Sequence, residues 1–356
     1  MDFKNLFKNK KILITGHTGF KGSWLTLILR SYGAKIIGIS NQVISKPSFY
    51  DSTKSMLYKD YFIDIRDIKS LKKIIKKEEP FCIFHLAAQS LVLKSYNNPL
   101  YTFTTNFNGT LNILEIVREI NRKIFLVCIT SDKSYQNIEK NTGYKEDDKL
   151  GGFDPYSASK GSTELLLNGY FNSFFKNKNS KIKLAIARAG NVIGGGDWSN
   201  DRIVPDAIKQ WSKNKTLVIR SPDSTRPWQH VLEPLSGYII LMSKLINEKN
   251  LNGEIFNFGP KNNLNKTVIE LINAMNKNWS SNKKFIIKKK NSQFKESKLL
   301  KLNSNKAKKI LNWECLLNFN ETVSLTSAWY KQYYNDKSKI LDLSIEQYEY
   351  YLKKND

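Results

Sequence analysis

The sequence has few cysteines and few acidic residues, and it has no long apolar run. Three cysteines are too few for a disulfide framework, and Cys82 and Cys128 lie in apolar segments typical of buried, reduced thiols. No segment approaches the roughly 18 apolar residues of a membrane span, and the first residues, MDFKNLFKNKK, lack the apolar core of a secretory signal. We therefore expect a soluble, cytoplasmic protein that does not engage a membrane.

The shortage of acidic residues leaves a strongly basic chain. Fifty-seven Lys and Arg against 32 Asp and Glu give a formal charge of +25, which attracts anionic ligands and, in some proteins, nucleic acids. Lysine is spread over the whole chain, however, and its densest stretch, 283–301, contains only two aromatic residues. Because that is a poor platform for stacking bases, we expect no nucleic-acid partner.

Apolar and helical patterns alternate over the first 190 residues. Longer helical patterns separate short apolar segments that predict strands buried on both faces. This alternation is typical of βαβ units in an α/β, doubly wound parallel sheet of the Rossmann type. The predicted strands are 11–15, 34–39, 82–88, 123–130 and 183–189, and the predicted helices are 24–32, 68–77, 111–120 and 156–175.

The alternation weakens after about residue 190, where Gly, Pro and Trp become frequent. Two domains fit this chain length at roughly 150 residues each. We assign residues 1–190 plus about 228–258 to the Rossmann domain. Residues 191–227 plus 259–356 are expected to form a smaller C-terminal domain that binds the substrate.

A glycine-rich loop, TGHTGFKG, joins the first predicted strand to the first helix. Gly16 and Gly19 allow a tight turn close to a diphosphate, Gly22 lets the helix pack on the sheet, and the helix N-terminus faces the anion. The position between strand and helix favours a dinucleotide site over a plain glycine-rich turn. His17 and Lys21 either add positive charge beside the phosphates or are solvated loop residues.

The segments after the second and third strands bear on the kind of dinucleotide. An acid after the second strand would bind the ribose 2′-hydroxyl of NAD, but here the strand ends in Ser40-Asn41, so these residues do not separate NAD from NADP. Asp64 ends a third short strand in FIDI and suits the adenine amino group. The alternative for Asp64 is a simple strand-end carboxylate.

Two short motifs supply acid–base groups. Tyr156 and Lys160 are four residues apart on a predicted helix, so both lie on one face. A neighbouring ammonium lowers the pKa of a phenol, which makes Tyr156 a plausible acid/base at a hydroxyl whose carbon loses hydride. The predicted strand 123–130 leads directly into Ser131-Asp132-Lys133. A hydroxyl, a carboxyl and an amine there exceed the needs of simple oxidation and point to an elimination, whereas an Asp–Lys ion pair capping a loop is the alternative.

Together these motifs resemble the extended short-chain dehydrogenase/reductase family and, within it, the CDP-glucose 4,6-dehydratases. The related dTDP-sugar dehydratases usually carry Thr-Asp-Glu where this chain has Ser131-Asp132-Lys133, and lysine in the third position is typical of the CDP-sugar branch. The resemblance covers nearly the whole chain and is carried by ITGHTGFKGSWL (14–25), HLAAQSLV (85–92), ITSDKSY (129–135), GGFDPYSASKG (151–161), RAGNVIGGGDW (188–198) and RPWQHVLEPLSGY (226–238).

The resemblance implies an enzyme that dehydrates CDP-glucose with tightly held NAD and no metal, for the synthesis of deoxysugars of surface polysaccharide, and that assembles as a homodimer or homotetramer. It implies catalytic roles for Ser131, Asp132, Lys133, Tyr156 and Lys160. The implied cofactor-binding residues, besides Tyr156 and Lys160, are Gly16, His17, Thr18, Gly19, Phe20, Lys21, Gly22, Asp64, Ile65, Leu86, Ala87 and Ala88. The implied substrate-binding residues are Gln89, Ser131, Asn191, Arg202 and Arg226.

Arginine suits a diphosphate because it forms paired hydrogen bonds, although surface ion pairing is the alternative for Arg202 and Arg226, and loop capping for Asn191. Trp198 and Trp228 are expected to pack at the domain junction rather than stack on cytosine. A 4-epimerase on the same fold would need Tyr156 but not Asp132 and Lys133. A non-catalytic protein of this fold would show gaps in the catalytic set, and this chain has none.

Overall fold

The computed structural model describes residues 2–260, 265–279, 284–288 and 299–354. Its centre is a seven-stranded parallel sheet of order β11-β6-β5-β4-β1-β2-β3. The sheet strands are β1 (Lys11–Thr15), β2 (Lys35–Ser40), β3 (Lys59–Phe62), β4 (Cys82–His85), β5 (Ile124–Ile129), β6 (Ile182–Ala189) and β11 (Ile255–Phe258). The expected doubly wound sheet is confirmed, with its reversal of strand order between β1 and β4.

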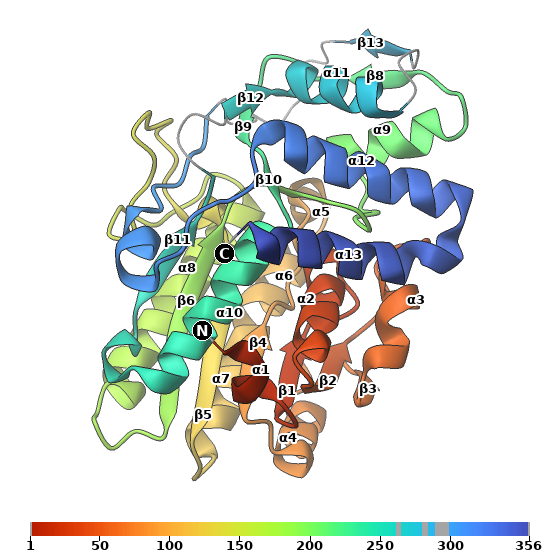
Figure 1. Ribbon diagram of the computed structural model, residues 1–356. Helices are drawn as coiled ribbons and strands as arrows, with labels where there is room; N and C mark the ends of the chain where they lie inside the picture. The colour runs from red at the N-terminus through yellow and green to blue at the C-terminus, as the bar shows by residue number, and fades with distance from the viewer. Residues whose placement is uncertain (1, 261–264, 280–283, 289–298, 355–356) are drawn as a thin grey trace.

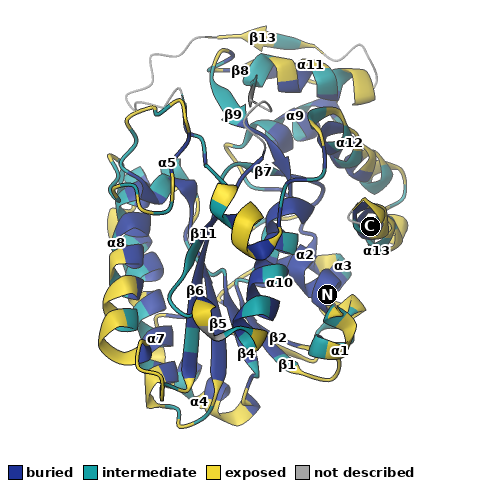
Figure 2. Ribbon diagram, turned by 60° about the vertical axis from the view of Figure 1, so that its left-hand side comes forward, coloured by how far each residue is buried: buried dark blue, intermediate teal, exposed yellow. Residues whose placement is uncertain are grey.

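Helices cover both faces of the sheet (Figure 1). Ile12 and Ile14 of β1 pack with α2 and α10 on one face, and Leu13 packs with α4 and α7 on the other. Both faces are therefore buried, as the uninterrupted apolar runs predict, and the strands are dark in Figure 2 between helices with exposed outer sides. The helices of this region are α1 (Phe3–Phe7), α2 (Phe20–Ser31), α3 (Tyr50–Thr53), α4 (Ile68–Glu78), α5 (Val92–Asn97), α6 (Pro99–Phe103), α7 (Gly109–Glu119), α8 (Pro155–Tyr170) and α10 (Leu232–Asn247).

The remaining elements gather beyond the carboxyl ends of the strands (Figure 1). They are β7 (Val192–Ile193), α9 (Ile203–Trp211), β8 (Leu217–Ile219), β9 (Thr225–Pro227), β10 (Gln229–His230), β12 (Asn265–Thr267), α11 (Val268–Trp279), β13 (Phe285–Ile287), α12 (Phe319–Asn335) and α13 (Ile340–Lys353). β11 lies in the segment 228–258 that we assign to the Rossmann domain, while the division into two domains itself stays a prediction.

One expected strand is misplaced. The third strand is Lys59–Phe62 and not FIDI, so Asp64 lies beyond its end. The reason is the partner: β3 pairs with β2 from Ile37 to Ser40, and the ladder stops at Phe62 because β2 ends there.

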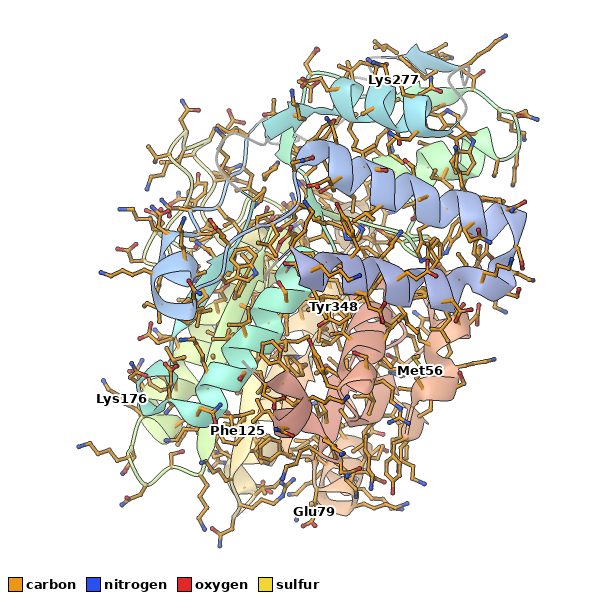
Figure 3. All side chains as sticks on the ribbon, in the orientation of Figure 1. Met56, Glu79, Phe125, Lys176, Lys277 and Tyr348 are labelled. Carbon is orange, nitrogen blue, oxygen red and sulfur yellow. The ribbon has the colours of Figure 1, made fainter. Side chains whose placement is uncertain are left out.

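Lysines lie over much of the surface, and the side chains of Lys176 and Lys277 point away from the ribbon in Figure 3. Most of the basic stretch 283–301 lies outside the described residues. None of the helices in the described ranges combines the length and the hydropathy needed to cross a bilayer.

Candidate active site

The loop between β1 and α2 lies against the loop that follows β4. Gly16 has φ +77°, and a Cβ there would stand 2.9 Å from Cα of Ala87; a Cβ on Gly22 would stand 2.2 Å from the carbonyl oxygen of Gly16. Only glycine permits these approaches. The result is a cradle of backbone at the N-terminus of α2, which fits the diphosphate of a dinucleotide.

The two basic residues of this loop both have partners in the fold: His17 is buried and Lys21 is half-buried. His17 is buried, and its ring nitrogens bond with Ser40 Oγ at 3.0 Å and Asp60 Oδ1 at 2.9 Å. Burial lowers the pKa of His17, so the ring is neutral at pH 7. Lys21 turns towards the centre of the molecule, where its Nζ donates to Tyr238 Oη at 3.4 Å. Burial and the charge of Arg202 lower the pKa of Lys21 to about 8.

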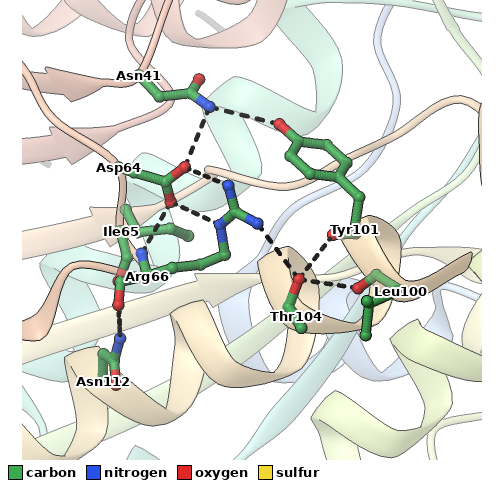
Figure 4. A network of polar contacts seen from close by, with 8 residues as sticks. All are labelled: Asn41, Asp64, Ile65, Arg66, Leu100, Tyr101, Thr104 and Asn112. Atoms are coloured by element: carbon green, nitrogen blue, oxygen red, sulfur yellow. Dashed lines mark hydrogen bonds and ion pairs between the residues drawn. The ribbon is translucent and has the colours of Figure 1, made fainter. Parts of the chain in front are cut away.

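Asp64 follows β3 and lies in a polar network (Figure 4). Arg66 pairs with it through Nη2 and Oδ2 at 2.7 Å, and Asn41 Nδ2 donates to it at 3.5 Å. The hydrogen bond from Arg66 holds the pKa of Asp64 below its usual value. This network therefore keeps an ionised acceptor beside Ile65 and the end of β2, where the adenine of a dinucleotide is expected; its role stays a prediction.

The segment after β4 connects the loop to the helices. Leu86 N donates to Thr15 O at 3.1 Å and Ala87 N to Thr15 Oγ1 at 3.2 Å, which places Ala87 and Ala88 along the cradle. The side-chain amide of Gln89 donates to Leu91 O and Thr102 Oγ1. Gln89 is thus engaged in the fold, and substrate binding by it stays a prediction.

Four of the predicted catalytic residues meet at the carboxyl end of β5. Ser131 Oγ donates to Asp132 Oδ1 at 2.9 Å and accepts from Lys133 N at 3.2 Å. Tyr156 lies in the first turn of α8, near enough to Ser131 for the serine to oppose the rise that burial causes in its pKa. Lys160 lies one turn further along α8 and, like Tyr156, is only 6% exposed. We call Ser131, Asp132, Tyr156 and Lys160 the reaction centre, and Lys133 lies at its edge in the short turn η3 (Asp132–Ser134).

Burial shifts the acid–base properties of the reaction centre. It raises the pKa of Asp132, which Lys133 and a hydrogen bond from Ser131 oppose. It lowers the pKa of Lys160 to about 8 and raises that of Tyr156 to about 12. No ion pair joins Asp132 to Lys133 in the described part of the chain, so the loop-capping alternative lacks its salt bridge. Shifted groups in a crevice are typical of a catalytic site.

A second polar cluster, which sequence reasoning missed, supports the reaction centre. Thr130 Oγ1 donates to Glu164 Oε1 at 2.7 Å, and Arg188 Nε donates to both oxygens of Glu164 at 2.8 Å. Arg188 also bonds with the hydroxyl of Tyr135. We call these four residues the structural ion pair cluster. It ties the end of β5 to α8 and so fixes Ser131 relative to Tyr156. Glu164 follows Lys160 by four residues, and this helical spacing is the sequence signal that would have placed Glu164 near the reaction centre.

The predicted substrate residues lie beyond β6. Arg202 Nη1 pairs with Asp197 Oδ2 at 2.9 Å, and Arg226 is close enough to Asp132 for its charge to lower the pKa of that carboxyl. Asn191 follows β6, and its carbonyl accepts from Gln229 N at 3.4 Å. Trp198 packs against Tyr330 and Tyr333, with ring centroids 5.1 and 4.8 Å apart, as expected of a packing residue.

The comparisons with known proteins agree with this geometry. The GDP-mannose 4,6 dehydratase family matches residues 13–326. The chain belongs to this family. It is 40% identical to a CDP-glucose 4,6-dehydratase of Salmonella typhimurium over 342 residues, which is 95% of each chain. It is 28% identical to a dTDP-D-glucose 4,6-dehydratase of Dictyostelium discoideum over 70% of this chain and 58% of that protein.

Solved structures of other proteins share the fold. An epimerase of Methanothermobacter thermautotrophicus has a TM-score of 0.81 at 23% identity, over 95% of this chain and 97% of that one. A dTDP-glucose 4,6-dehydratase of Bacillus anthracis in complex with NAD has a TM-score of 0.74 at 22% identity, over 94% and 99%. The described residues of the present chain contain no cluster of His, Cys, Asp and Glu that would hold a metal ion.

Proposed function

We propose that the protein is a CDP-glucose 4,6-dehydratase, a hydro-lyase that converts CDP-glucose to CDP-4-keto-6-deoxyglucose and water with bound NAD. The observation that carries the proposal is the meeting of an oxidation pair, Tyr156 and Lys160, with an elimination pair, Asp132 and Lys133, around one serine. The 40% identity to a CDP-glucose 4,6-dehydratase supports the choice of substrate.

The backbone cradle at Gly16 and Gly22 fits the diphosphate of NAD, and Asp64 is an ionised acceptor for its adenine. Lys160 would hold the nicotinamide ribose. Bound NAD would supply the hydride acceptor for oxidation at C4 and, once reduced, the hydride donor for C6. The same carbon framework is thus oxidised and reduced within one turnover, so no cofactor is consumed.

The residues of the chain move the protons. Tyr156 removes the proton of the C4 hydroxyl while Ser131 donates a hydrogen bond to the C4 oxygen. The resulting ketone acidifies C5–H, and Lys133 takes that proton. Asp132, whose pKa is raised by burial, protonates the C6 hydroxyl as it leaves as water, and Lys133 returns its proton to C5. Each acid–base group contributes roughly 10²–10⁴-fold.

Arg202 and Arg226 carry the charges proposed to bind the diphosphate of the substrate. Arg202 is oriented by Asp197, which leaves its second terminal nitrogen for a phosphate oxygen. The cytosine preference, the cytoplasmic location and the homodimer or homotetramer stay predictions; light scattering coupled to size-exclusion chromatography tests the last of these.

The test of the proposed function uses the purified protein with NAD and, separately, CDP-, dTDP-, UDP- and GDP-sugars. We expect the alkaline absorbance of a 4-keto product with CDP-glucose above all others. CDP-glucose deuterated at C4 should give product with deuterium at C6. Deuterium retained at C4 with an intact C6 hydroxyl would indicate an epimerase, and deuterium in free reduced cofactor would indicate a net dehydrogenase.

Lys133→Met tests the elimination half of the mechanism. The side chain has similar length but cannot take a proton, so C4 is oxidised while the hydroxyl on C6 is retained. Stopped-flow absorbance should show reduced nicotinamide that persists, together with loss of exchange of the C5 proton with solvent. Normal product formation by this variant would assign the base to another residue.

A further inference from the structure

His85 is a buried side chain at the end of β4 that the proposed mechanism does not use. Its ring lies between two threonines, with Nδ1 2.7 Å from Thr15 Oγ1 and Nε2 3.0 Å from Thr110 Oγ1. Thr15 ends β1, and Thr110 lies in the first turn of α7. The ring therefore joins β1 and β4, the two strands between which the strand order reverses, to the helix α7.

The hydrogen bonds of the two threonines decide which ring nitrogen of His85 carries the proton. Thr110 Oγ1 donates its single proton to Asn106 O at 2.7 Å, so it can only accept from His85 Nε2–H. Nδ1 is then the acceptor and receives the proton of Thr15 Oγ1, which itself accepts from Ala87 N at 3.2 Å. Burial lowers the pKa of His85 to about 3, so the ring is neutral at pH 7, as this pattern of one donor and one acceptor requires.

Asn106 continues this chain of hydrogen bonds to the helix that carries Tyr156. It lies in the turn that precedes α7. Its side-chain amide accepts from Gln89 N at 2.7 Å and donates to Gln89 O at 3.1 Å and to Ser159 Oγ at 2.8 Å. Ser159 Oγ donates in turn to Tyr156 O at 2.7 Å. Hydrogen bonds between buried residues therefore connect the loop after β4, which borders the cradle, to the first turns of α8.

We propose that His85 is a positioning residue that holds the dinucleotide cradle in register with Tyr156 and Lys160. Through Nδ1 it fixes Thr15 and, beyond it, the backbone of Ala87 at the edge of the cradle. Through Nε2 it fixes the turn before α7 and, beyond that turn, α8. Oxidation at C4 needs the hydroxyl base and the bound nicotinamide in a fixed relative position, and His85 is the side chain that contacts both halves of this arrangement. This inference rests on the proposed function.

Two substitutions of His85 separate the two sides of its ring. The amide oxygen of an asparagine stands at the position of Nδ1, so His85→Asn keeps the acceptor for Thr15 and loses the donor to Thr110. The amide nitrogen of a glutamine reaches the position of Nε2, so His85→Gln keeps the donor and loses the acceptor. Each variant leaves one buried partner of the ring unmatched, so both should lose similar stability. A difference between their functions is therefore not an effect of stability.

NAD affinity and turnover report on the two sides of the ring separately. Titration calorimetry measures the binding of NAD to the cofactor-free protein, and turnover of CDP-glucose is measured at saturating NAD. We expect His85→Gln to bind NAD about 10-fold more weakly and to keep turnover within about 3-fold. We expect the reverse for His85→Asn, with the wild-type affinity for NAD and turnover lower by about 10-fold. The same changes in both variants would overturn the positioning role.

Threonine variants test the same contacts if a variant of His85 fails to fold. Thr110→Val should reproduce the loss of turnover of His85→Asn, and Thr15→Val should reproduce the loss of NAD affinity of His85→Gln. The matched control is Thr326→Val on α12, because Thr326 is buried and, like Thr110, donates to the carbonyl four residues earlier at 2.7 Å.

Equal effects of Thr110→Val and Thr326→Val on turnover would overturn the positioning role. A wild-type protein that binds NAD but yields no dehydrated product from CDP-glucose would instead overturn the proposed function, so the two failures are distinguishable.

Discussion

Two clusters of buried polar residues meet at neighbouring turns of α8. They differ in whether their charged side chains are paired with an opposite charge. In the structural ion pair cluster, Glu164 and Arg188 are each 1% exposed and joined by several hydrogen bonds. In the reaction centre, Asp132 and Lys160 are also buried, but no described ion pair joins either to an opposite charge. One turn of helix separates Lys160 from Glu164.

The paired charges stabilise the fold, whereas the unpaired groups are able to exchange protons. Burial alone would lower the pKa of Arg188, but the charge of Glu164 raises it, so Arg188 stays ionised at any ordinary pH. Burial without a partner brings Lys160 down to about 8 and raises the pKa of Asp132. Groups whose pKa values approach neutrality exchange protons readily, whereas paired ions do not. The first three predictions below change a residue of one of these clusters, and the fourth changes the cap of the helix that carries residues of both.

Tyr156→Phe removes the phenol from the reaction centre and has the largest expected effect. Turnover of CDP-glucose should fall by roughly 10²–10⁴-fold because no group takes the C4 proton. The matched control is Tyr135→Phe, which removes a phenol from the structural ion pair cluster and should keep turnover within several-fold. Steady-state assays on protein with wild-type circular dichroism make the comparison. Equal losses in both variants would erase the distinction between the clusters.

Arg188→Met leaves the carboxylate of Glu164 buried without its partner. We expect the free energy of unfolding to drop by about 3–5 kcal/mol, measured by urea denaturation of the ligand-free protein. The double variant Arg188→Met/Glu164→Gln removes both charges and should regain much of this loss. A single variant as stable as the wild type would show that the ion pair is not what holds β6 to α8.

Lys160→Met tests the unpaired charge through pH. The pKa of Lys160 is about 8 in the folded chain against 10.5 for a free lysine. Between these values the unfolded chain binds more protons, so wild-type stability rises with pH. Burying the ammonium costs about 3 kcal/mol below pH 8, a cost that fades by pH 10.5. The stability advantage of Lys160→Met in urea should shrink accordingly; a pH-independent difference would contradict the shifted pKa.

Asp154→Ala has the smallest expected effect because it touches neither cluster directly. Asp154 caps α8, with Oδ1 accepting from Ser157 N at 3.0 Å. Its loss should lower the free energy of unfolding by about 1 kcal/mol, while Asp154→Ser, which keeps a cap, should cost less. Thermal unfolding measures both. A larger loss of turnover than of stability would mean that the cap positions Tyr156.

Local sequence patterns predicted many of the strands and helices. β1 matches its predicted range, and the helices α4, α7 and α8 begin within two residues of the expected positions, because apolar periodicity and capping act over a few residues. The misplaced third strand depended on where its partner β2 ends. The orientation of Lys21 depended on Tyr238, 217 residues away. Burial of His17 depends on hydrogen bonds of its ring with Ser40 and Asp60, and neither residue adjoins it in the chain.

The amino-acid sequence predicts the α/β alternation, the glycine loop and the types of acid–base residue at Ser131, Asp132, Lys133, Tyr156 and Lys160. These features can be predicted from the sequence because they are local: they depend on strand and helix periodicity, on tight glycine turns and on side-chain chemistry. Which of the charged side chains are paired follows from the folding of the chain. Whether a buried group keeps its charge depends on neighbours brought in from other strands and helices, as Arg188 of β6 is brought to Glu164 of α8 while Lys160 receives no such partner in the described chain.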